Sequence, residues 1–438
     1  MNAEHSRWKS GFTIGLLLTV IFSFTIGVAD QNSSSFLDMT FNSPNGYALW
    51  HTHNASQDRN LEMAIQQNGN ILVGGYTNNT NQKDIQVLRY YPNGTLDSGF
   101  GKGGWLTYSG AAGKDDYAFG IALDAKNNIL VSGREDNGNN ADILLLRYTP
   151  DGIRDSSFGV NGTVTYRGSG NGTDSGRGLV VQKDGKIVVC GEVNVSSHKE
   201  LAVLRYTPEG KLDPDFASSG VFTLSNMSGA ESYGFAVALD QNEHILVTGS
   251  SHEDGTDRIV LVKLDENGLL DSSFGSGGTV VWNGQQGGPD YGNWVSVTAE
   301  DNILVTGVET DTSGSFDIVL IRYHSDGTLD TTFGTDGVAR FGYSGYQYAW
   351  GQTRMPDGRI IVAGASLVGT HVTPVLIGFT KDGKLDTSFG SNGVVSFETI
   401  GIGRLYAVHE DDKGGLVACG YITESDTDLR LLLRMNPE

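Results

Sequence analysis

Cysteine, proline and positive charge are all scarce in this sequence. Of its 438 residues, two are cysteines, nine are prolines and 18% are charged, whereas 61 are glycines. Low charge with many glycines and evenly spread β-branched residues favours a fold with many tight turns and argues against a disordered chain. Cys190 and Cys419 occupy the same slot in two distant copies of the repeat described below. A disulfide needs Cα atoms within about 7 Å, so we expect both thiols to be free and buried.

The shortage of basic residues excludes one class of partner. Lys and Arg number 30 against 51 Asp and Glu, which gives a formal net charge of −21, and no basic run interrupts the acidic chain. Such a chain repels nucleic acid and anionic membrane surfaces. We therefore expect no nucleic-acid partner.

Familiar catalytic and metal-binding motifs are lacking too. The sequence has no Gly-x-Ser-x-Gly elbow, no His-Glu-x-x-His, no phosphate loop with Lys-Ser/Thr and no EF-hand loop. His51 and His53 have a chelating spacing, but His409 of the same predicted sheet lies three strands away. At about 4.8 Å per strand that is roughly 14 Å, whereas zinc ligands lie about 2 Å from the ion. No metal or other cofactor is expected.

The N-terminus has the pattern of an export signal. Arg7 and Lys9 precede an apolar run from Gly11 to Val28, which is followed by a small-residue cleavage site. The pattern predicts a signal peptide over residues 1–29 and a linker over residues 30–36. The predicted location is secreted or extracytoplasmic, in the periplasm or at the cell surface. An uncleaved membrane anchor is the alternative.

One phrase, Leu/Arg-Asp-x-x-Phe, recurs along the whole chain. Its phenylalanine stands at positions 41, 100, 158, 216, 274, 333 and 389, so successive copies are 56 to 59 residues apart. A fixed period of this size is typical of a stacked repeat. A repeat also escapes the limit of about 250–300 residues on one hydrophobic core, because each unit is buried only against its neighbours.

The third unit shows the content of each repeat. Apolar runs at 178–182 and 186–191 flank an Asp-Gly turn, the strongest local signal for a hairpin. Further runs follow at 201–206 and 221–224. Four antiparallel strands in one unit are the content of a propeller blade.

The two ends of the chain predict closure into a ring. An extra strand at 47–52 precedes the first complete unit, and the last unit, over 405–435, supplies only three strands. We therefore predict an all-β seven-bladed β-propeller over residues 37–438, closed by the N-terminal strand completing the last blade. A linear solenoid is the alternative, but it should carry polar capping repeats at its ends.

The repeated motifs resemble those of the delta-60 repeat proteins, which carry D-G-K-I-L-V-x-G and L-D-x-x-F-G phrases. Asp184-Gly185-Lys186-Ile187-Val188-Val189 matches the first phrase and Leu385-Asp386-Thr387-Ser388-Phe389-Gly390 the second. The resemblance covers about residues 37–438. Departures are local: Ala217 follows Phe216, and Thr373-Pro374 and Gly378 replace the usual polar ends of a third strand. The resemblance implies a β-propeller and no single activity.

The recurring Asp and Phe have a structural interpretation. Seven aspartates spread around a ring cannot converge on one ion, and an Asp soon after a turn caps local backbone N–H groups. The phenylalanine is expected to be a plug between blades, and losing one should cost about 3–5 kcal/mol.

Candidate binding residues come from the non-repetitive loops. Loops joining the fourth strand of one unit to the first of the next, and the second to the third, are expected on one face of the ring. The candidate ligand-binding residues there are Asp116, Tyr117, Asp174, Tyr233, Asp290, Tyr291, Tyr348 and Tyr406. Tyrosines with carboxylates can stack on sugars or clasp a peptide. Packing between blades near the rim is a second interpretation of the same tyrosines.

Three functional hypotheses remain open from the sequence. The first is an exported, monomeric, non-enzymatic propeller that binds a protein or glycan ligand through its loop face. The second is a propeller-type lyase or hydrolase with His198, His252 or His371 as base and loop carboxylates as partners. The third is a purely structural surface protein with no saturable ligand.

Overall fold

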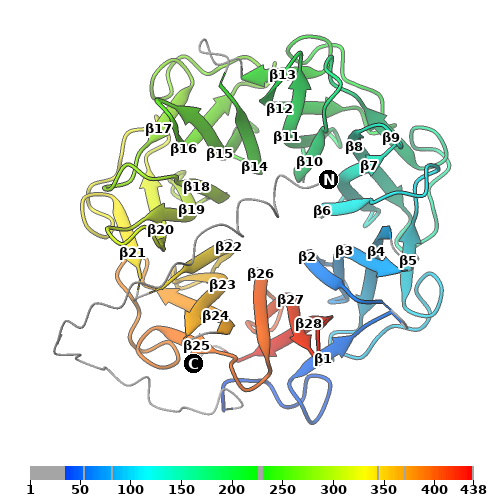
Figure 1. The fold of residues 1–438 in the computed structure, drawn as a ribbon, viewed down its shortest axis with the longest axis vertical. Coiled ribbons are helices and arrows are strands. Elements are labelled where there is room, and N and C mark those ends of the chain that lie inside the picture. Colours follow the sequence, from blue (N-terminus) through cyan, green and yellow to red (C-terminus); the bar gives the residue numbers. More distant parts are fainter. Residues whose placement is uncertain are drawn as a thin grey trace, which may run out of the picture. The chain divides into compact units, whose positions relative to one another are not determined.

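The computed structural model describes residues 35–52, 55–79, 82–224, 230–342, 345–368 and 371–436. The predicted signal peptide, His53 and nearly all of the predicted linker lie outside these residues. Across the described ranges, no helix is long and apolar enough to cross a membrane. The described residues contain 28 β-strands in seven four-stranded antiparallel sheets, which stand around a common centre as the blades of a propeller (Figure 1). The predicted fold is confirmed.

The first three blades each use four consecutive strands. Blade 1 contains β2 (Asp58–Ile65), β3 (Ile71–Asn79), β4 (Gln82–Tyr90) and β5 (Trp105–Tyr108). Blade 2 contains β6 (Tyr117–Leu123), β7 (Ile129–Asp136), β8 (Ala141–Tyr148) and β9 (Thr163–Tyr166). Blade 3 contains β10 (Ser175–Val181), β11 (Ile187–Val195), β12 (His198–Tyr206) and β13 (Val221–Leu224).

The next three blades repeat this order. Blade 4 contains β14 (Ser232–Leu239), β15 (Ile245–Glu253), β16 (Thr256–Leu264) and β17 (Thr279–Trp282). Blade 5 contains β18 (Tyr291–Val297), β19 (Ile303–Thr310), β20 (Phe316–Tyr323) and β21 (Val338–Phe341). Blade 6 contains β22 (Gln347–Arg354), β23 (Ile360–Val368), β24 (His371–Phe379) and β25 (Val394–Ser396).

Blade 7 joins the two ends of the propeller sequence. It contains β26 (Ile402–Glu410), β27 (Leu416–Glu424), β28 (Thr427–Met435) and, on its outer edge, β1 (Tyr47–Trp50). Strand β1 pairs antiparallel with β28 in the register Tyr47 to Leu433. The N-terminal strand therefore closes the ring, as predicted, and is two residues shorter than the predicted 47–52.

Antiparallel order gives the ring two chemically different faces. Each blade begins at the centre with its first strand (Figure 1), and its strands alternate in direction. Loops from the fourth strand to the next blade and from the second strand to the third therefore share one face, which we call the loop face. Direct bonds confirm this, because the Asp174 N–H donates to the Ala141 carbonyl. The opposite side, with the first-to-second and third-to-fourth connections, is the turn face.

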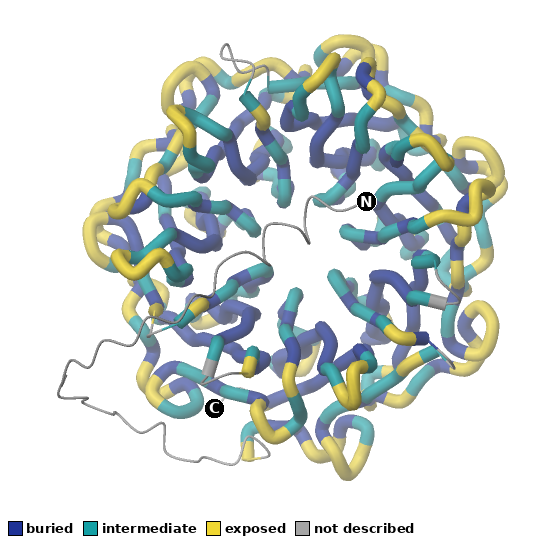
Figure 2. Tube along the Cα trace, viewed as in Figure 1, coloured by how far each residue is buried: buried dark blue, intermediate teal, exposed yellow. Residues whose placement is uncertain are grey.

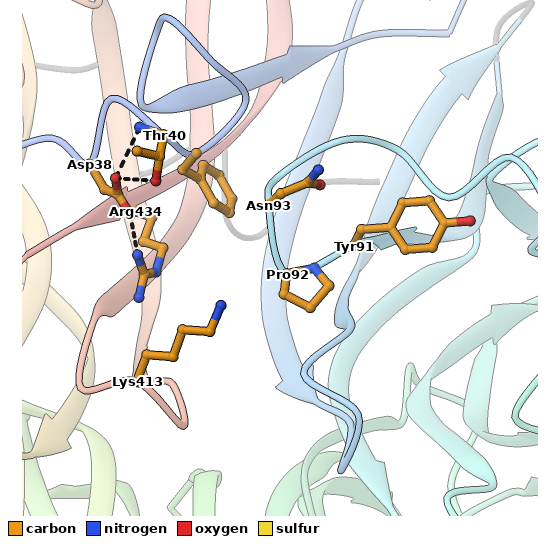
Figure 3. A pocket seen from close by; sticks show the side chains of 8 residues that line it. Asp38, Thr40, Tyr91, Pro92, Asn93, Lys413 and Arg434 are labelled. Atoms are coloured by element: carbon orange, nitrogen blue, oxygen red, sulfur yellow. Dashed lines mark hydrogen bonds and ion pairs between the residues drawn. The ribbon is translucent and has the colours of Figure 1, made fainter.

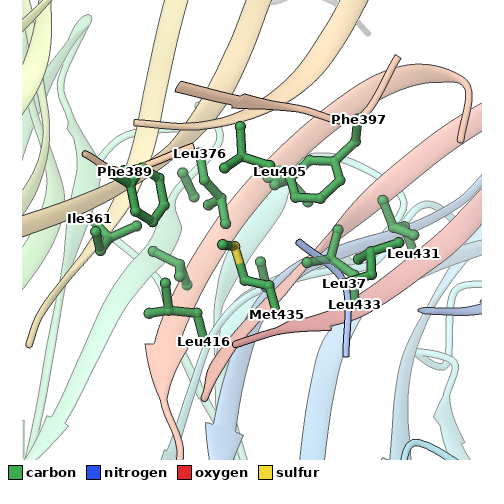
Figure 4. Close-up of a cluster of buried hydrophobic side chains, with 14 of the residues drawn as sticks. Leu37, Ile361, Leu376, Phe389, Phe397, Leu405, Leu416, Leu431, Leu433 and Met435 are labelled. Atoms are coloured by element: carbon green, nitrogen blue, oxygen red, sulfur yellow. The ribbon is translucent and has the colours of Figure 1, made fainter. Parts of the chain in front are cut away.

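The hydrophobic core lies between neighbouring blades rather than at one centre. Buried residues fill the sheets, and exposed residues concentrate in the peripheral loops (Figure 2). Figure 4 shows one such interface, in which Ile361, Leu376 and Phe389 from blade 6 meet Leu405 and Leu416 from blade 7. The N-terminal segment joins the same cluster through Leu37.

The recurring phenylalanine is the plug between blades that the sequence predicts. Phe216 is fully buried and lies against the turn of the next unit, where a Cβ added to Gly268 would come within 2.5 Å of its ring. Phe41 with Gly94, Phe100 with Gly152, Phe158 with Gly210, Phe274 with Gly327 and Phe333 with Gly383 repeat this contact. A side chain larger than hydrogen at these glycines would displace the ring.

The recurring aspartate caps backbone N–H groups, as predicted, and also pairs with a basic side chain, which the sequence analysis did not predict. Asp213 accepts from the Asp215 N–H at 3.1 Å and from Arg205 Nε at 2.8 Å. Equivalent ion pairs join Asp97 to Arg89, Asp155 to Arg147, Asp330 to Arg322 and, across the closure, Asp38 to Arg434. In blade 6 this arginine is replaced by Gly378, which the sequence analysis identifies as a departure from the repeat motif. Cys190 and Cys419 are free and buried, also as predicted.

Candidate functional site

The candidate tyrosines lie on the innermost strands. Tyr117 and Tyr291 begin β6 and β18, Tyr233 and Tyr348 are the second residues of β14 and β22, and Tyr406 lies within β26. All five are half-buried. Because first strands start at the loop face, four of these rings stand at the loop-face end of the innermost layer.

A β-bulge in every first strand places a second side chain beside each tyrosine. The register with the second strand shifts between Ala118 and Gly120, between Gly234 and Ala236, and at the matching point of all seven blades. A bulge leaves one residue unpaired and re-aims its side chain. The unpaired residues are Leu61, Phe119, Arg177 together with Gly178, Phe235, Asn293, Trp350 and Tyr406.

Aromatic contacts continue from blade to blade at this level. Tyr348 stacks on Trp350 with ring centroids 5.5 Å apart, and Trp350 meets Tyr406 of the next blade at 4.9 Å. Tyr406 in turn contacts Tyr421 at 6.1 Å. Tyr117 stacks on Phe119 at 5.9 Å. Each offset or tilted pair contributes about 0.5–1.5 kcal/mol beyond burial, so the rings form a rigid surface.

Cations bridge the gaps between these rings. Arg177 lies between Phe119 of blade 2 and Phe235 of blade 4, at 5.3 and 5.2 Å from the two ring centroids. Arg134 lies 4.4 Å from the Tyr117 ring. We call the whole set the aromatic–cation belt. Its members are Arg59, Tyr76, Lys83, Tyr117, Phe119, Arg134, Arg177, Lys199, Tyr233, Phe235, Tyr291, Phe316, Tyr346, Tyr348, Trp350, Arg404, Tyr406 and Tyr421.

Charge is distributed unevenly around the belt. Its arginines and lysines come from blades 7, 1, 2 and 3, whereas blades 4, 5 and 6 contribute only aromatic members. Arg177 pairs with the fully buried Glu192 at 2.8 Å, and Lys199 approaches the same carboxylate at 3.5 Å. Burial alone would raise the pKa of Glu192, but the two cations hold that pKa below its ordinary value.

The tyrosine hydroxyls are anchored by acidic residues. Tyr233 donates to Glu231 at 2.6 Å, and burial together with this carboxylate raises the Tyr233 pKa. Tyr291 donates to Asp257 at 2.8 Å, and the other oxygen of Asp257 lies 2.9 Å from His252 Nδ1. Burial raises the pKa of Tyr406 to about 12. The phenols of Tyr233 and Tyr406 therefore stay neutral at ordinary pH.

The three candidate aspartates stand behind the belt and not within it. Asp116, Asp174 and Asp290 are at most 1% exposed. Asp116 accepts from the backbone N–H groups of Gly110 at 2.6 Å and Asp136 at 3.0 Å, and the other two make the same pair of bonds. Burial raises the pKa of Asp116 and of Asp290 to about 6. In this arrangement their oxygens hold the loops that present the tyrosines.

The candidate histidines lie on three different hairpins between second and third strands. His198 contacts Glu200 at 3.1 Å in blade 3, His252 contacts Asp257 in blade 4, and His371 is exposed in blade 6. His252 reaches a belt residue through Asp257, which accepts a hydrogen bond from Tyr291. Within the described ranges, no group of three His, Cys, Asp or Glu side chains could hold a metal ion.

Sequence reasoning identified the bulged Tyr406 but missed the bulged aromatics Phe119, Phe235 and Trp350 and every cation of the belt. A usable signal was the Tyr-x-aromatic spacing, which occurs as Tyr117-Ala118-Phe119, Tyr233-Gly234-Phe235 and Tyr348-Ala349-Trp350. The cations gave no such signal, since Arg134 and Lys199 belong to second and third strands.

A separate pocket lies on the turn face at the ring closure. Figure 3 shows Asp38 and Arg434 on one side and Tyr91, Pro92 and Asn93 on the other. None of the predicted binding or catalytic residues lines it. The Asp38–Arg434 ion pair in this pocket is equivalent to the structural Asp–Arg pairs of the other blades. We therefore attribute the pocket to the way the ring closes and not to a ligand.

Comparison with known proteins supports the fold and says little of activity. The model described as a domain of unknown function (DUF5122) beta-propeller matches residues 66–100, 127–158, 182–216, 242–274, 301–333 and 356–389. No curated protein matches the sequence significantly.

Solved structures similar to this chain have diverse descriptions. A Dyadobacter fermentans protein of unknown function is 12% identical with a TM-score of 0.48, and the match covers 90% of this chain and 100% of that one. Drosophila semaphorin 1b, extracellular domains 1–2, is 8% identical with a TM-score of 0.42, over 89% and 86% of the two chains. The polysaccharide lyase Uly1 is 11% identical with a TM-score of 0.45, over 86% and 90%. Likeness at this level carries no argument about activity. The chain is therefore a seven-bladed propeller that contains DUF5122 beta-propeller repeats, six segments of which are matched.

Proposed function

We propose that this protein is an exported, non-enzymatic propeller that binds a protein or glycan ligand through the aromatic–cation belt on its loop face. The carrying observation is the contrast between repeated and non-repeated residues. The recurring Phe packs between blades and the recurring Asp forms a structural ion pair, so both have a structural role. The belt positions instead change from Arg59 to Tyr117, Tyr233 and Arg404 around the ring, as expected of a surface shaped for a ligand.

The chemistry of the belt suits binding. Tyr, Trp and Arg are the side chains enriched where proteins bind partners, because they combine large area with polar tips and few rotatable bonds. Ring stacking and anchored hydroxyls fix the belt before a ligand arrives, which lowers the entropic cost of association. The delta-60 resemblance, the monomeric state and the extracytoplasmic location are parts of this same proposal.

The direct test removes three rings at once. The variant Tyr117→Ala/Tyr233→Ala/Tyr291→Ala should lose capture of ligands found by screening wild-type protein on glycan and peptide arrays. The matched control is Tyr91→Ala, because Tyr91 is 42% exposed on the turn face. Unchanged capture by the triple variant, with a melting temperature close to wild type, would refute the proposal.

A second candidate function rests on the chain His252–Asp257–Tyr291. A histidine oriented by a carboxylate is a usable general base, and this one ends beside a belt tyrosine. A lyase or hydrolase of this kind should show a pH–rate limb near pH 6–7 that His252→Asn removes. A broad screen of glycan and ester substrates without turnover would count against it.

A further inference from the structure

Two arginines of the belt differ from every other arginine in the described part of the chain. The guanidinium groups of Arg134 and Arg404 make neither an ion pair nor a hydrogen bond with any described residue, although both backbones are paired in β-sheets. The other described arginines pair with carboxylates, apart from Arg154, which donates to Thr163, and Arg430, which donates to Asn60. In a chain with 51 acidic residues, two half-buried cations without an acid stand out.

Both guanidinium groups lie over aromatic rings. The Arg134 guanidinium carbon lies 4.4 Å from the Tyr117 centroid and 5.7 Å from the Phe119 centroid. That of Arg404 lies 5.3 Å from the Tyr348 centroid and 5.4 Å from the Trp350 centroid. A guanidinium packed on a ring is held in place, while its N–H donors point outward in its own plane. N–H donors along the edge of a guanidinium group can bind a carboxylate through two parallel hydrogen bonds.

We infer that the belt binds an anionic glycan built from hexuronate residues, with Arg134 and Arg404 receiving its carboxylates; this rests on the proposed function of the belt. A hexuronate carries a carboxylate directly on a ring whose C–H faces can stack on an aromatic side chain. Each of the two arginines lies beside aromatic rings. One sugar residue can therefore place its carboxylate on the arginine and its C–H face on the neighbouring aromatic ring.

The lining favours a sugar chain over an acidic peptide. Peptides that bind as a helix or as an added strand require a hydrophobic groove or a free strand edge, whereas arginine clusters also recognise acidic peptides, so the shape of the lining must distinguish the two ligands. Among the unpaired bulge residues of the first strands, Leu61 is the one aliphatic side chain, and four are aromatic. Aromatic faces with cations between them match alternating rings and carboxylates. Blades 7, 1, 2 and 3 would receive the charged groups, and the aromatic members of blades 4, 5 and 6 would receive ring faces.

The experiment compares ligands that differ only in charge. Wild-type protein is titrated with oligomers of galacturonate, glucuronate and mannuronate, with their methyl esters, and with polyglutamate, while tryptophan fluorescence or heat is recorded. We expect at least one acid oligomer to bind, its ester to bind at least tenfold more weakly, and added NaCl to weaken binding. Arg134→Gln and Arg404→Gln should each weaken binding about ten- to hundredfold, the effect of losing a charged hydrogen-bond pair.

Matched variants separate this proposal from a structural effect. Arg167→Gln removes an exposed arginine from the same face and should leave binding unchanged, whereas Arg134→Lys, which keeps the charge without the fork, should be intermediate. Equal binding of acid and ester oligomers would overturn the hexuronate assignment and leave the binding proposal standing. Preference for polyglutamate would overturn the glycan in favour of a peptide. No binding of any probe by wild type would overturn this inference, whereas the proposed function would fall with a negative array screen or with unchanged capture by the triple tyrosine variant.

Discussion

Replacing Phe216 by alanine should lower the free energy of unfolding of the propeller by about 3–5 kcal/mol. The ring of Phe216 is fully buried, lies 4.5 Å below the Arg205 guanidinium carbon and fills the space against Gly268 of the next unit. Its loss removes burial and leaves a cavity that rigid β-sheets cannot close, which accounts for the size of the effect.

The shift in melting temperature follows from the size of the unit. Unfolding entropy of about 2.1 cal/mol/K per residue, over roughly 400 residues, amounts to about 0.8 kcal/mol/K, so a loss of about 4 kcal/mol lowers Tm by about 5 °C. Differential scanning calorimetry measures this shift. Leu269→Ala, in the same turn but 59% exposed, should change stability by less than about 0.5 kcal/mol.

A double-mutant cycle tests the plug itself. Gly268→Ala alone should destabilise, because its backbone has φ +78° and the new Cβ would lie 2.5 Å from the Phe216 ring. In Phe216→Ala that steric conflict is gone. The double variant should therefore lose less stability than the sum of the losses of the two single variants. Strict additivity, or a Phe216→Ala shift no larger than that of Leu269→Ala, would refute the interblade plug.

Three further outcomes follow from the structure. Glu192→Leu should destabilise by about 3–5 kcal/mol, because it strands two belt cations beside a buried site; a chemical denaturation midpoint equal to wild type would contradict this. The pKa of Asp116 and Asp290 is raised to about 6 in the folded state from 3.8, so the folded protein binds more protons in that interval and their effect lowers stability as pH rises through it. Asp116→Asn and Asp290→Asn should therefore show a smaller loss of Tm than wild type between about pH 4 and pH 6, and an unchanged pH dependence would reject the shift. Asp38→Asn should weaken the ring closure and speed proteolytic release of the N-terminal segment, whereas the equivalent Asp213→Asn in blade 3 should lower Tm without that release.

Much of the fold could be predicted from the sequence because its information is periodic. The spacing of the recurring phenylalanine predicted seven blades, and the three strands of the last unit predicted closure by an N-terminal strand. Both are present in the structure. The roles of Asp213 and Phe216 were predictable as well, because a residue that recurs in every unit must serve every unit.

The aromatic–cation belt could be predicted only in part. Tyr117, Tyr233, Tyr291 and Tyr348 were identified, since they follow loops that break the repeat. Phe119 and Arg177 were not, because a bulge breaks the two-residue alternation from which side-chain direction is read. Arg134 and Arg404 come together with aromatic rings through strand register and blade stacking, which local sequence does not encode.

The partner of β1 has a consequence for how the protein is made. Strand β1 precedes the six blades made of consecutive strands and pairs with β28, which follows them, so the ribosome must translate all of β2 to β28 before β1 can pair. Until then the growing product has bare hydrogen-bonding rims, which invite association with other chains. A product cut short before its last hairpin would keep those rims, so premature termination is expected to yield aggregating species and not smaller working rings.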